Sequence, residues 1–174
     1  MADAAATVER LCATVADYPV PGVVFKDLTP VFADGEALKQ VVDAIITAFA
    51  GSFDAVAGVE ARGFLLAAAV AYASGTGVIT IRKAGKLPRE VFAQSYALEY
   101  GEATLELHQH DVLTGTRVLI LDDVLATGGT LGAAAGLLER AGAVVAGIGV
   151  VLEIDALPGR ANLSGREIHS LLHV

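Results

Sequence analysis

Residues 118–130 read Val-Leu-Ile-Leu-Asp-Asp-Val-Leu-Ala-Thr-Gly-Gly-Thr. The apolar residues that open this stretch would be buried on both faces, which is typical of a central strand in a parallel sheet. Asp122 and Asp123 end the predicted strand, and a short turn leads into a helix that begins at Thr130. Ligands of parallel α/β sheets bind above the carboxyl ends of the strands, so we expect the functional site in this turn.

The turn contains residue types that suit a phosphate group. Gly128 and Gly129 allow the backbone to approach the ligand closely, and Thr127 and Thr130 add hydroxyl donors. The first N–H groups of the next helix are unpaired and lie at the positive end of its dipole. The two carboxylates precede the turn, where they could accept hydrogen bonds from sugar hydroxyls. The stretch therefore predicts a site for a phosphorylated ribose.

Other kinds of site share part of this pattern. A strand that ends in two acids also resembles the magnesium-binding strand of P-loop hydrolases, but the chain contains no G-x-x-x-x-G-K-[ST] sequence. It also lacks G-x-G-x-x-G, so a dinucleotide site has no fingerprint. An ordinary buried strand followed by a polar turn would not require two acids and then Ala-Thr-Gly-Gly-Thr.

Hydrophobic periodicity predicts helices that alternate with strands along the chain. This order favours an α/β fold with a mostly parallel sheet covered on both sides. Helical spacing or small-residue runs indicate helices over 1–16, 38–49, 64–73 and 130–141, and short apolar runs indicate strands over 55–59, 78–81, 104–108, 118–121 and 144–152.

Two segments do not fit this alternation. Residues 18–32 hold three prolines, so much of this segment is expected to be extended. Residues 84–103 contain glycine and proline among polar residues and are predicted to form a long loop. Long loops in compact domains are often functional lids, although this one could also be a mobile connection.

Composition limits the class of protein. The chain has 174 residues, of which 54% are hydrophobic and 18% charged, which suits one well-packed domain. Its single cysteine, Cys12, excludes an internal disulfide and favours a reducing, cytoplasmic setting; Cys12 itself is expected in the core. Neither a targeting signal nor a membrane span is expected, because no apolar run approaches the roughly 20 residues that a span needs.

Charge argues against one class of partner and favours another. The net charge of −8 argues against broad nucleic-acid binding. Five of the twelve basic residues nevertheless lie within 28 positions, where a small polyanion could bind, although a solvated basic face is the alternative. These residues are Arg62, Arg82, Lys83, Lys86 and Arg89.

Residues 118–130 resemble the motif by which type I phosphoribosyltransferases bind phosphoribosyl pyrophosphate (PRPP). Further blocks stand in the order found in the adenine phosphoribosyltransferase family: 22–27, 60–64, 82–88, 95–101 and Glu153-Ile154. The resemblance spans most of the chain. It implies a single domain over 1–174, in which helices flank a mostly parallel central sheet. A small hood, formed mainly by 18–32 and 153–174, and a long flexible catalytic loop complete the fold that it implies.

The resemblance also implies an activity. Members of the family transfer the phosphoribosyl group of PRPP to adenine and release AMP and pyrophosphate, a purine-salvage reaction. The expected cofactor is Mg²⁺, carried in with PRPP and bound largely by substrate oxygens and water, so no permanent protein metal site is expected. The family is generally dimeric, and the implied assembly is a homodimer.

Residue roles carry over by position. Asp122 and Asp123 would hold the ribose hydroxyls, and the 5′-phosphate would lie on Ala126, Thr127, Gly128, Gly129 and Thr130. Pyrophosphate would contact Arg62, Arg82, Lys83 and Lys86, of which Arg62 and Lys86 would also stabilise the reacting centre. Adenine would be read by the backbone of Val24 and Lys26 and held between the side chains of Phe25 and Ile154.

The lid would contribute the remaining groups. Glu99 is the candidate acid or base for the proton on adenine, while Ser95 and Tyr100 would shape the closed lid. Lys26 stands where relatives often have arginine, which leaves its side-chain role open. Ala126 stands where enzymes for hypoxanthine and guanine typically have aspartate, which favours adenine as the base.

Two alternatives follow from the same residues. A transferase of this fold could act on another base, such as xanthine or orotate, or a regulator could have kept the PRPP site without turnover. The histidine pairs, 108 with 110 and 169 with 173, are not expected to bind metal, because no carboxylate or cysteine partner is apparent near them in the sequence.

Overall fold

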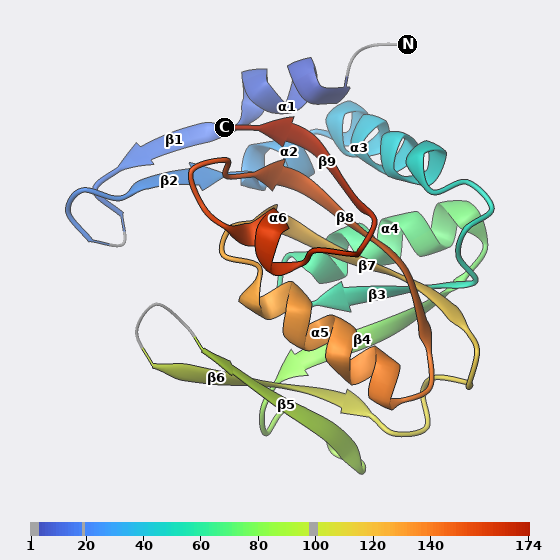
Figure 1. Cartoon of the computed structure of the whole chain (residues 1–174). Coiled ribbons are helices and arrows are strands. Elements are labelled where there is room, and N and C mark those ends of the chain that lie inside the picture. Colours follow the sequence, from blue (N-terminus) through green and yellow to red (C-terminus); the bar gives the residue numbers. More distant parts are fainter. Residues whose placement is uncertain (1–3, 19, 98–100) are drawn as a thin grey trace.

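The computed structural model describes residues 4–18, 20–97 and 101–174. Within these residues a seven-stranded sheet forms the centre of the molecule (Figure 1), with the strand order β5-β6-β4-β3-β7-β8-β9. Five neighbouring strands are parallel: β4 (Gly77–Lys83), β3 (Ala55–Val59), β7 (Arg117–Leu125), β8 (Val144–Glu153) and β9 (Ile168–His173). The strands β5 (Val91–Ala97) and β6 (Glu102–His108) form an antiparallel hairpin at one edge. The predicted mostly parallel α/β fold is confirmed.

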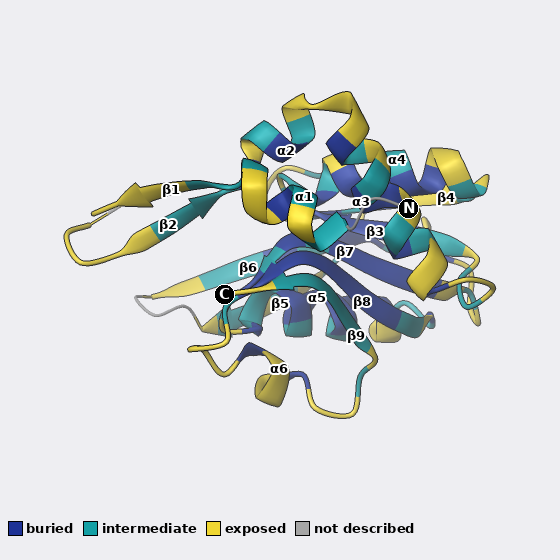
Figure 2. Ribbon diagram, turned by 90° about the horizontal axis from the view of Figure 1, so that it is seen from above, coloured by how far each residue is buried: buried dark blue, intermediate teal, exposed yellow. Residues whose placement is uncertain are grey.

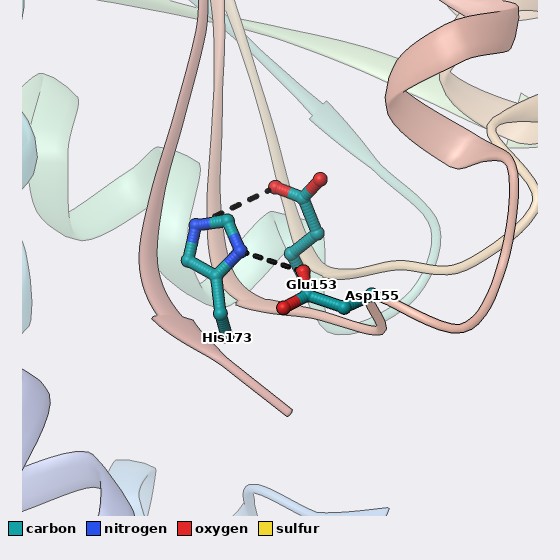
Figure 3. Close-up of side chains that lie close together, drawn as sticks. All are labelled: Glu153, Asp155 and His173. Carbon is teal, nitrogen blue, oxygen red and sulfur yellow. Dashed lines mark hydrogen bonds and ion pairs between the residues drawn. The ribbon is translucent and has the colours of Figure 1, made fainter.

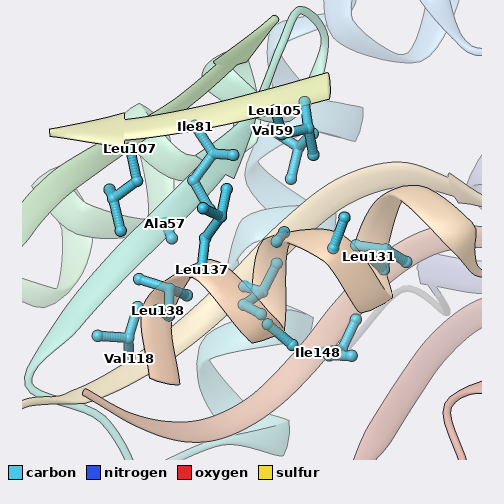
Figure 4. Close-up of a cluster of buried hydrophobic side chains, with 14 of the residues drawn as sticks. Ala57, Val59, Ile81, Leu105, Leu107, Val118, Leu131, Leu137, Leu138 and Ile148 are labelled. Carbon is cyan, nitrogen blue, oxygen red and sulfur yellow. The ribbon is translucent and has the colours of Figure 1, made fainter. Parts of the chain in front are cut away.

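Helices cover both faces of the sheet because its central strands are apolar on both sides. In β7, Val118 and Ile120 pack with α5 (Gly129–Arg140) in the cluster shown in Figure 4. Leu119 and Leu121 point to the other face, where α1 (Ala4–Leu11), α3 (Gly35–Ala48) and α4 (Gly63–Ser74) form a second core. Figure 2 shows the buried strands between these layers. No helix among the described residues is long and apolar enough to cross a membrane.

The first 33 residues differ from the prediction in two places. The helix predicted over 1–16 ends at Leu11, and Ala13–Ala16 is a strand, β1, that pairs antiparallel with β2 (Val24–Asp27). The segment 18–32 contains not only β2 but also the short helix α2 (Thr29–Ala33). Proline near the start of α2 is compatible with helix, since the first N–H groups of a helix need no intrahelical partner. The β1–β2 ribbon projects away from the main sheet (Figure 2).

Three further elements were not predicted. The segment 84–103, predicted as a loop, contains β5, which is stabilised by pairing with β6 along its length. The short helix α6 (Gly159–Asn162) and the edge strand β9 follow β8. Both lie beside the end of β8, so the last part of the chain returns to the edge of the sheet where the site was predicted.

Candidate active site

The site is assembled at the carboxyl ends of four adjacent parallel strands. These strands lie in the order β4-β3-β7-β8, and their carboxyl ends point to the same edge of the sheet. Along this edge lie Arg82 and Lys83 from β4, Glu60–Arg62 after β3, Asp122–Thr130 from β7 and the following turn, and Ile154 after β8. Parallel pairing thus brings together residues that are widely separated in the sequence.

The two carboxylates lie inside β7 and not after it, because the strand continues to Leu125. Asp123 is buried, with 6% of its surface exposed, and its N–H donates to Asp122 Oδ1 over 2.9 Å. Burial, followed by the neighbouring charge of Asp123, raises the pKa of Asp122 well above its usual range. Water can stabilise negative charge on these two adjacent carboxylates only poorly. Hydrogen-bond donors or cations, from a ligand or from the protein, are therefore needed to stabilise it.

Arg62 provides one cation to this pair. Its Nε lies 2.5 Å from Asp123 Oδ2, and its guanidinium lies 5.7 Å from the centre of the Phe25 ring. Asp123 Oδ2 is buried and, within the described residues, receives no hydrogen bond of good geometry despite this ion pair. Arg62 thus connects the acids to the aromatic ring on β2, while Tyr18 packs edge-on against Phe25 at 5.2 Å.

The turn after β7 has the backbone shape that its glycines predict. Gly128 has φ of 83°, in the left-handed region, and caps the N-terminus of α5. The hydroxyl of Thr130 donates to the hydroxyl of Tyr96 on β5 over 3.3 Å. A Cβ at Gly129 would lie 3.3 Å from both the Ala97 carbonyl and the Tyr96 ring, so the turn also lies directly against the β5–β6 hairpin.

Glu60 contacts three of the four residues that were predicted to bind pyrophosphate. Its carboxylate pairs with Lys86, lies 3.4 Å from Arg82 Nε and accepts the Lys83 N–H over 3.0 Å. The hydrogen bond from Lys86 is the main cause that keeps the pKa of Glu60 below its usual value. The sequence placed Glu60 in a family block but did not reveal this role, because its partners lie at the end of the next strand and just after it.

The β1–β2 ribbon leaves one edge of β2 without a strand partner among the described residues. The Tyr18 N–H donates to the Val23 carbonyl, so Val23 faces β1. Backbone groups alternate along a strand, so those of Val24 and Lys26 face the outer edge. The Lys26 side chain donates to the Thr14 hydroxyl over 3.0 Å, which ties the two strands together.

Ile154 is bracketed by a polar cluster that the sequence did not predict. Figure 3 shows His173 between Glu153 and Asp155, with its Nδ1 2.8 Å from Asp155 Oδ1 and its Nε2 3.8 Å from Glu153 Oε2. The expectation that the histidines lack carboxylate partners is wrong, both here and at His108, whose Nδ1 lies 2.9 Å from Asp111 Oδ2. Asp111 lies only three residues after His108, so the sequence contained the signal for that pair. The contacts of His173 depend on strand pairing and loop return, which sequence spacing does not reveal.

The Glu153 cluster resembles a metal site in its residue types, since its three potential ligand atoms lie within 4.8 Å of one another. Both oxygens of Glu153 are nevertheless used by Arg160, at 2.9 and 2.6 Å. A guanidinium that already neutralises the most buried carboxylate disfavours a divalent cation there. We therefore treat the cluster as structural.

Of the three predicted lid residues, Ser95 lies within the described part of the chain. Ser95 lies on β5 and shares a 2.8 Å hydrogen bond with the Thr104 hydroxyl on β6. Glu99 and Tyr100 lie outside the described residues. The described part of the β5–β6 pair contacts the turn after β7 through Tyr96.

Known proteins share both the sequence and the fold. The phosphoribosyl transferase domain family matches residues 31–165. The adenine phosphoribosyltransferase of Arthrobacter sp. (strain FB24) is 68% identical over 167 residues, which cover 96% of this chain and 90% of that protein. The crystal structure of the enzyme from Thermoanaerobacter pseudethanolicus has a TM-score of 0.93 and 43% identity, covering 96% of this chain and 98% of the other.

A third relative was crystallised with ligands. The Saccharomyces cerevisiae adenine phosphoribosyltransferase, in complex with an imino-altritol bisphosphate and adenine, has a TM-score of 0.93 and 34% identity, and the match covers 99% of this chain and 100% of that one. Sequence identity and fold agree in all of these comparisons. The chain therefore belongs to the phosphoribosyltransferase family and, within it, to the adenine phosphoribosyltransferases.

Proposed function

We propose that this chain carries out the reaction of its family, the transfer of a phosphoribosyl group from PRPP to adenine, with the strand-edge residues described above. One observation carries the proposal. Carboxylates for a sugar, a glycine turn for a phosphate, a cluster of cations and an aromatic ring all meet at one edge of the sheet. Together they match the sugar, 5′-phosphate, pyrophosphate and base of the two substrates.

The ribose 5-phosphate portion of PRPP is proposed to bind over β7 and the turn after it. Asp122 and Asp123 would accept hydrogen bonds from the ribose hydroxyls, and Asp123 Oδ2 would become an acceptor for this purpose when an incoming polyanion draws Arg62 away from it. Residues 126–130 would surround the 5′-phosphate, where Gly128 keeps the turn open and the first N–H groups of α5 face the anion.

The pyrophosphate portion is proposed to bind to Arg62, Arg82, Lys83 and Lys86. Glu60 and Asp123 form ion pairs with Arg62, Arg82 and Lys86 in the structure. An incoming polyanion would compete with the two carboxylates for the same donors. Positive charge that is already in place stabilises the negative charge that develops on the leaving group.

Adenine is proposed to bind between Phe25 and Ile154. The outward-facing backbone groups of Val24 and Lys26 support this assignment, because N–H and C=O groups two residues apart can read one edge of a flat base. The Lys26 side chain binds Thr14, so it would act on the ribbon and not on the base. Glu99 would manage the proton on the imidazole ring of adenine, and Ser95 and Tyr100 would shape the closed lid.

Mg²⁺ is proposed to enter with PRPP. The paired carboxylates of Asp122 and Asp123 provide the hard oxygen donors that this cation prefers, directly or through water. When bound, the cation would neutralise charge on the pyrophosphate. The protein residues would orient the sugar and exclude water from it.

The domain organisation, the assembly and the cellular location of the chain are also proposed. A single domain over 1–174, with a hood drawn mainly from 18–32 and 153–174, is supported by the β1–β2 ribbon, which forms a separate two-stranded sheet that projects away from the main one (Figure 2). A homodimer is supported by exposed apolar residues on α4 and the start of β4, among them Leu65 and Tyr72. A single cysteine and the salvage reaction fit a cytoplasmic location.

A panel of bases tests the proposed reaction. The protein is incubated with PRPP and Mg²⁺ and with adenine, hypoxanthine, guanine, xanthine or orotate, and the nucleotide and pyrophosphate are measured. Adenine should be the one base that supports rapid pyrophosphate release. Comparable turnover with hypoxanthine would contradict the assignment of the base site, and turnover with none would favour a regulator.

A further inference from the structure

The short helix α6 packs closely against the turn that is proposed to bind the 5′-phosphate. A Cβ on Gly159 would overlap the carbonyl oxygen of Ala126 and would lie 2.7 Å from Leu125 Cδ1. In return, a Cβ on Gly128 would lie 2.7 Å from the Gly159 carbonyl oxygen. Two glycines therefore let the backbone of α6 lie directly on the backbone of the turn.

A side chain of α6 adds a directed contact to this packing. Asn162 Nδ2 donates to the Thr127 carbonyl over 2.9 Å. Gly128 already needs a left-handed conformation, so the peptide between residues 127 and 128 is constrained at both ends. Fixing the Thr127 carbonyl determines which way the next N–H group points, because the peptide unit is planar.

The helix is itself firmly attached. Arg160 donates to both oxygens of Glu153, which is 5% exposed, and lies 3.2 Å from the Ser170 hydroxyl on β9. Ser170 also donates to Glu153. The Ile154 N–H donates to the Leu125 carbonyl over 3.0 Å, so the segment between β8 and α6 is joined to the strand that precedes the turn.

We infer that Gly159 and Asn162 of α6 are positioning residues that fix the phosphate turn, residues 126–130, in its binding shape before the ligand arrives. Neither residue needs to touch the substrate. Their effect should be confined to the group that the turn binds, since among the described residues no hydrogen bond or ion pair joins α6 to Glu60, Arg82 or Lys86. The inference rests on the proposed assignment of the 5′-phosphate to this turn.

Calorimetry with ribose 5-phosphate and with inorganic pyrophosphate distinguishes a specific effect on the phosphate turn from a general loss of structure in the site. Asn162→Ala should weaken ribose 5-phosphate binding about 3- to 10-fold, the scale of one hydrogen bond. Gly159→Ala should weaken it more, by about 10-fold or greater, because its Cβ must displace the turn. Inorganic pyrophosphate should bind both variants within 2-fold of the parent. In steady-state kinetics, KM for PRPP should rise while KM for adenine stays unchanged.

Two controls match the variants. Gly136→Ala adds the same methyl group on α5, where nothing lies within 4 Å, and Ser164→Ala removes an exposed polar group two residues after Asn162. Both should bind ribose 5-phosphate like the parent. Thermal unfolding and circular dichroism would verify that Asn162→Ala, the milder change, leaves the fold intact.

The outcomes also separate this inference from the assignment on which it rests. Gly129→Val tests the turn itself, because its branched side chain obstructs the approach of a phosphate. Loss of ribose 5-phosphate binding in Gly129→Val, with parent-like binding in both α6 variants, would overturn the role of α6 alone. Unchanged binding in Gly129→Val would overturn the phosphate assignment, and the inference with it. Equal losses for ribose 5-phosphate and pyrophosphate in the α6 variants would also overturn it, since they indicate nonspecific disruption.

Discussion

At the scale of single residues, the candidate site is organised by ion pairs between its acidic and basic side chains. Arg62 pairs with the buried Asp123, and Lys86 and Arg82 pair with Glu60. The sequence placed each of these residues in a motif. It could not show the pairs, because Arg62 follows β3 and Asp123 lies within β7, and the two residues meet only when these strands lie side by side.

The proposed acid or base is tested by the smallest available change. Glu99→Gln keeps the shape of the side chain but removes its ionisable group. If Glu99 moves the proton on adenine, kcat should fall by about 10²- to 10⁴-fold, while affinities for adenine and PRPP change far less. Single-turnover kinetics would ensure that the chemical step is measured.

A matched variant controls for charge on the hairpin. Glu102 is an exposed residue at the start of β6, so Glu102→Gln removes the same charge near the same hairpin and should leave kcat within 2-fold. Equal kcat in Glu99→Gln and the parent would remove Glu99 from the mechanism. The main source of rate would then be electrostatic stabilisation by Arg62, Arg82 and Lys86.

At the scale of elements, the sequence predicted those whose own residues carry the pattern. The strand 55–59 was predicted with its observed bounds, because a strand buried on both faces is a short unbroken apolar run. The strands β5 and β9 were missed because polar residues interrupt them and neighbouring strands stabilise them. Helix α6 has four residues, too few to show any periodicity.

The attachment of α6 makes a prediction about stability. Hydrogen bonds from Arg160 are the main cause that lowers the pKa of Glu153 below its ordinary value of 4.5. A carboxyl whose pKa is lower in the folded state stabilises the protein above its unfolded pKa. This stabilisation is lost as the pH falls through the lowered, folded pKa. Glu153→Gln should therefore reduce the free energy of unfolding at pH 7 by about 1–3 kcal/mol, and by less below pH 4.5.

Urea unfolding at pH 7 and at several values below 4.5 would measure this difference. Glu139→Gln serves as a control, because Glu139 pairs with Arg166 at 2.6 Å but is about half exposed. An exposed ion pair contributes little, so this variant should differ from the parent by less than about 1 kcal/mol at pH 7. A difference for Glu153→Gln that stays constant from pH 7 to pH 3 would contradict the ionic role of Glu153.

At the scale of the whole molecule, one helix presents a face that the described fold does not cover. Helix α4 contains no charged residue, and Leu65 and Tyr72 on its outer side are 54% and 91% exposed. Val78, at the start of β4, is 44% exposed. The inner side of the same helix packs in the core through Leu66 and Val70. Helices that are apolar on both sides are typically buried on both sides.

The proposed homodimer would cover this face, and substitution there should separate the subunits. Aspartate at an apolar interface would be buried without a partner, so Leu65→Asp combined with Tyr72→Asp should destabilise association while leaving the inner face of α4 in place. Light scattering after gel filtration should give twice the chain mass of 17.8 kDa for the parent and 17.8 kDa for the variant. Leu113→Asp, at an exposed leucine between β6 and β7, should remain dimeric. A parent that elutes at 17.8 kDa at micromolar concentrations would reject the dimer, and a dimeric double variant would assign the interface to another surface.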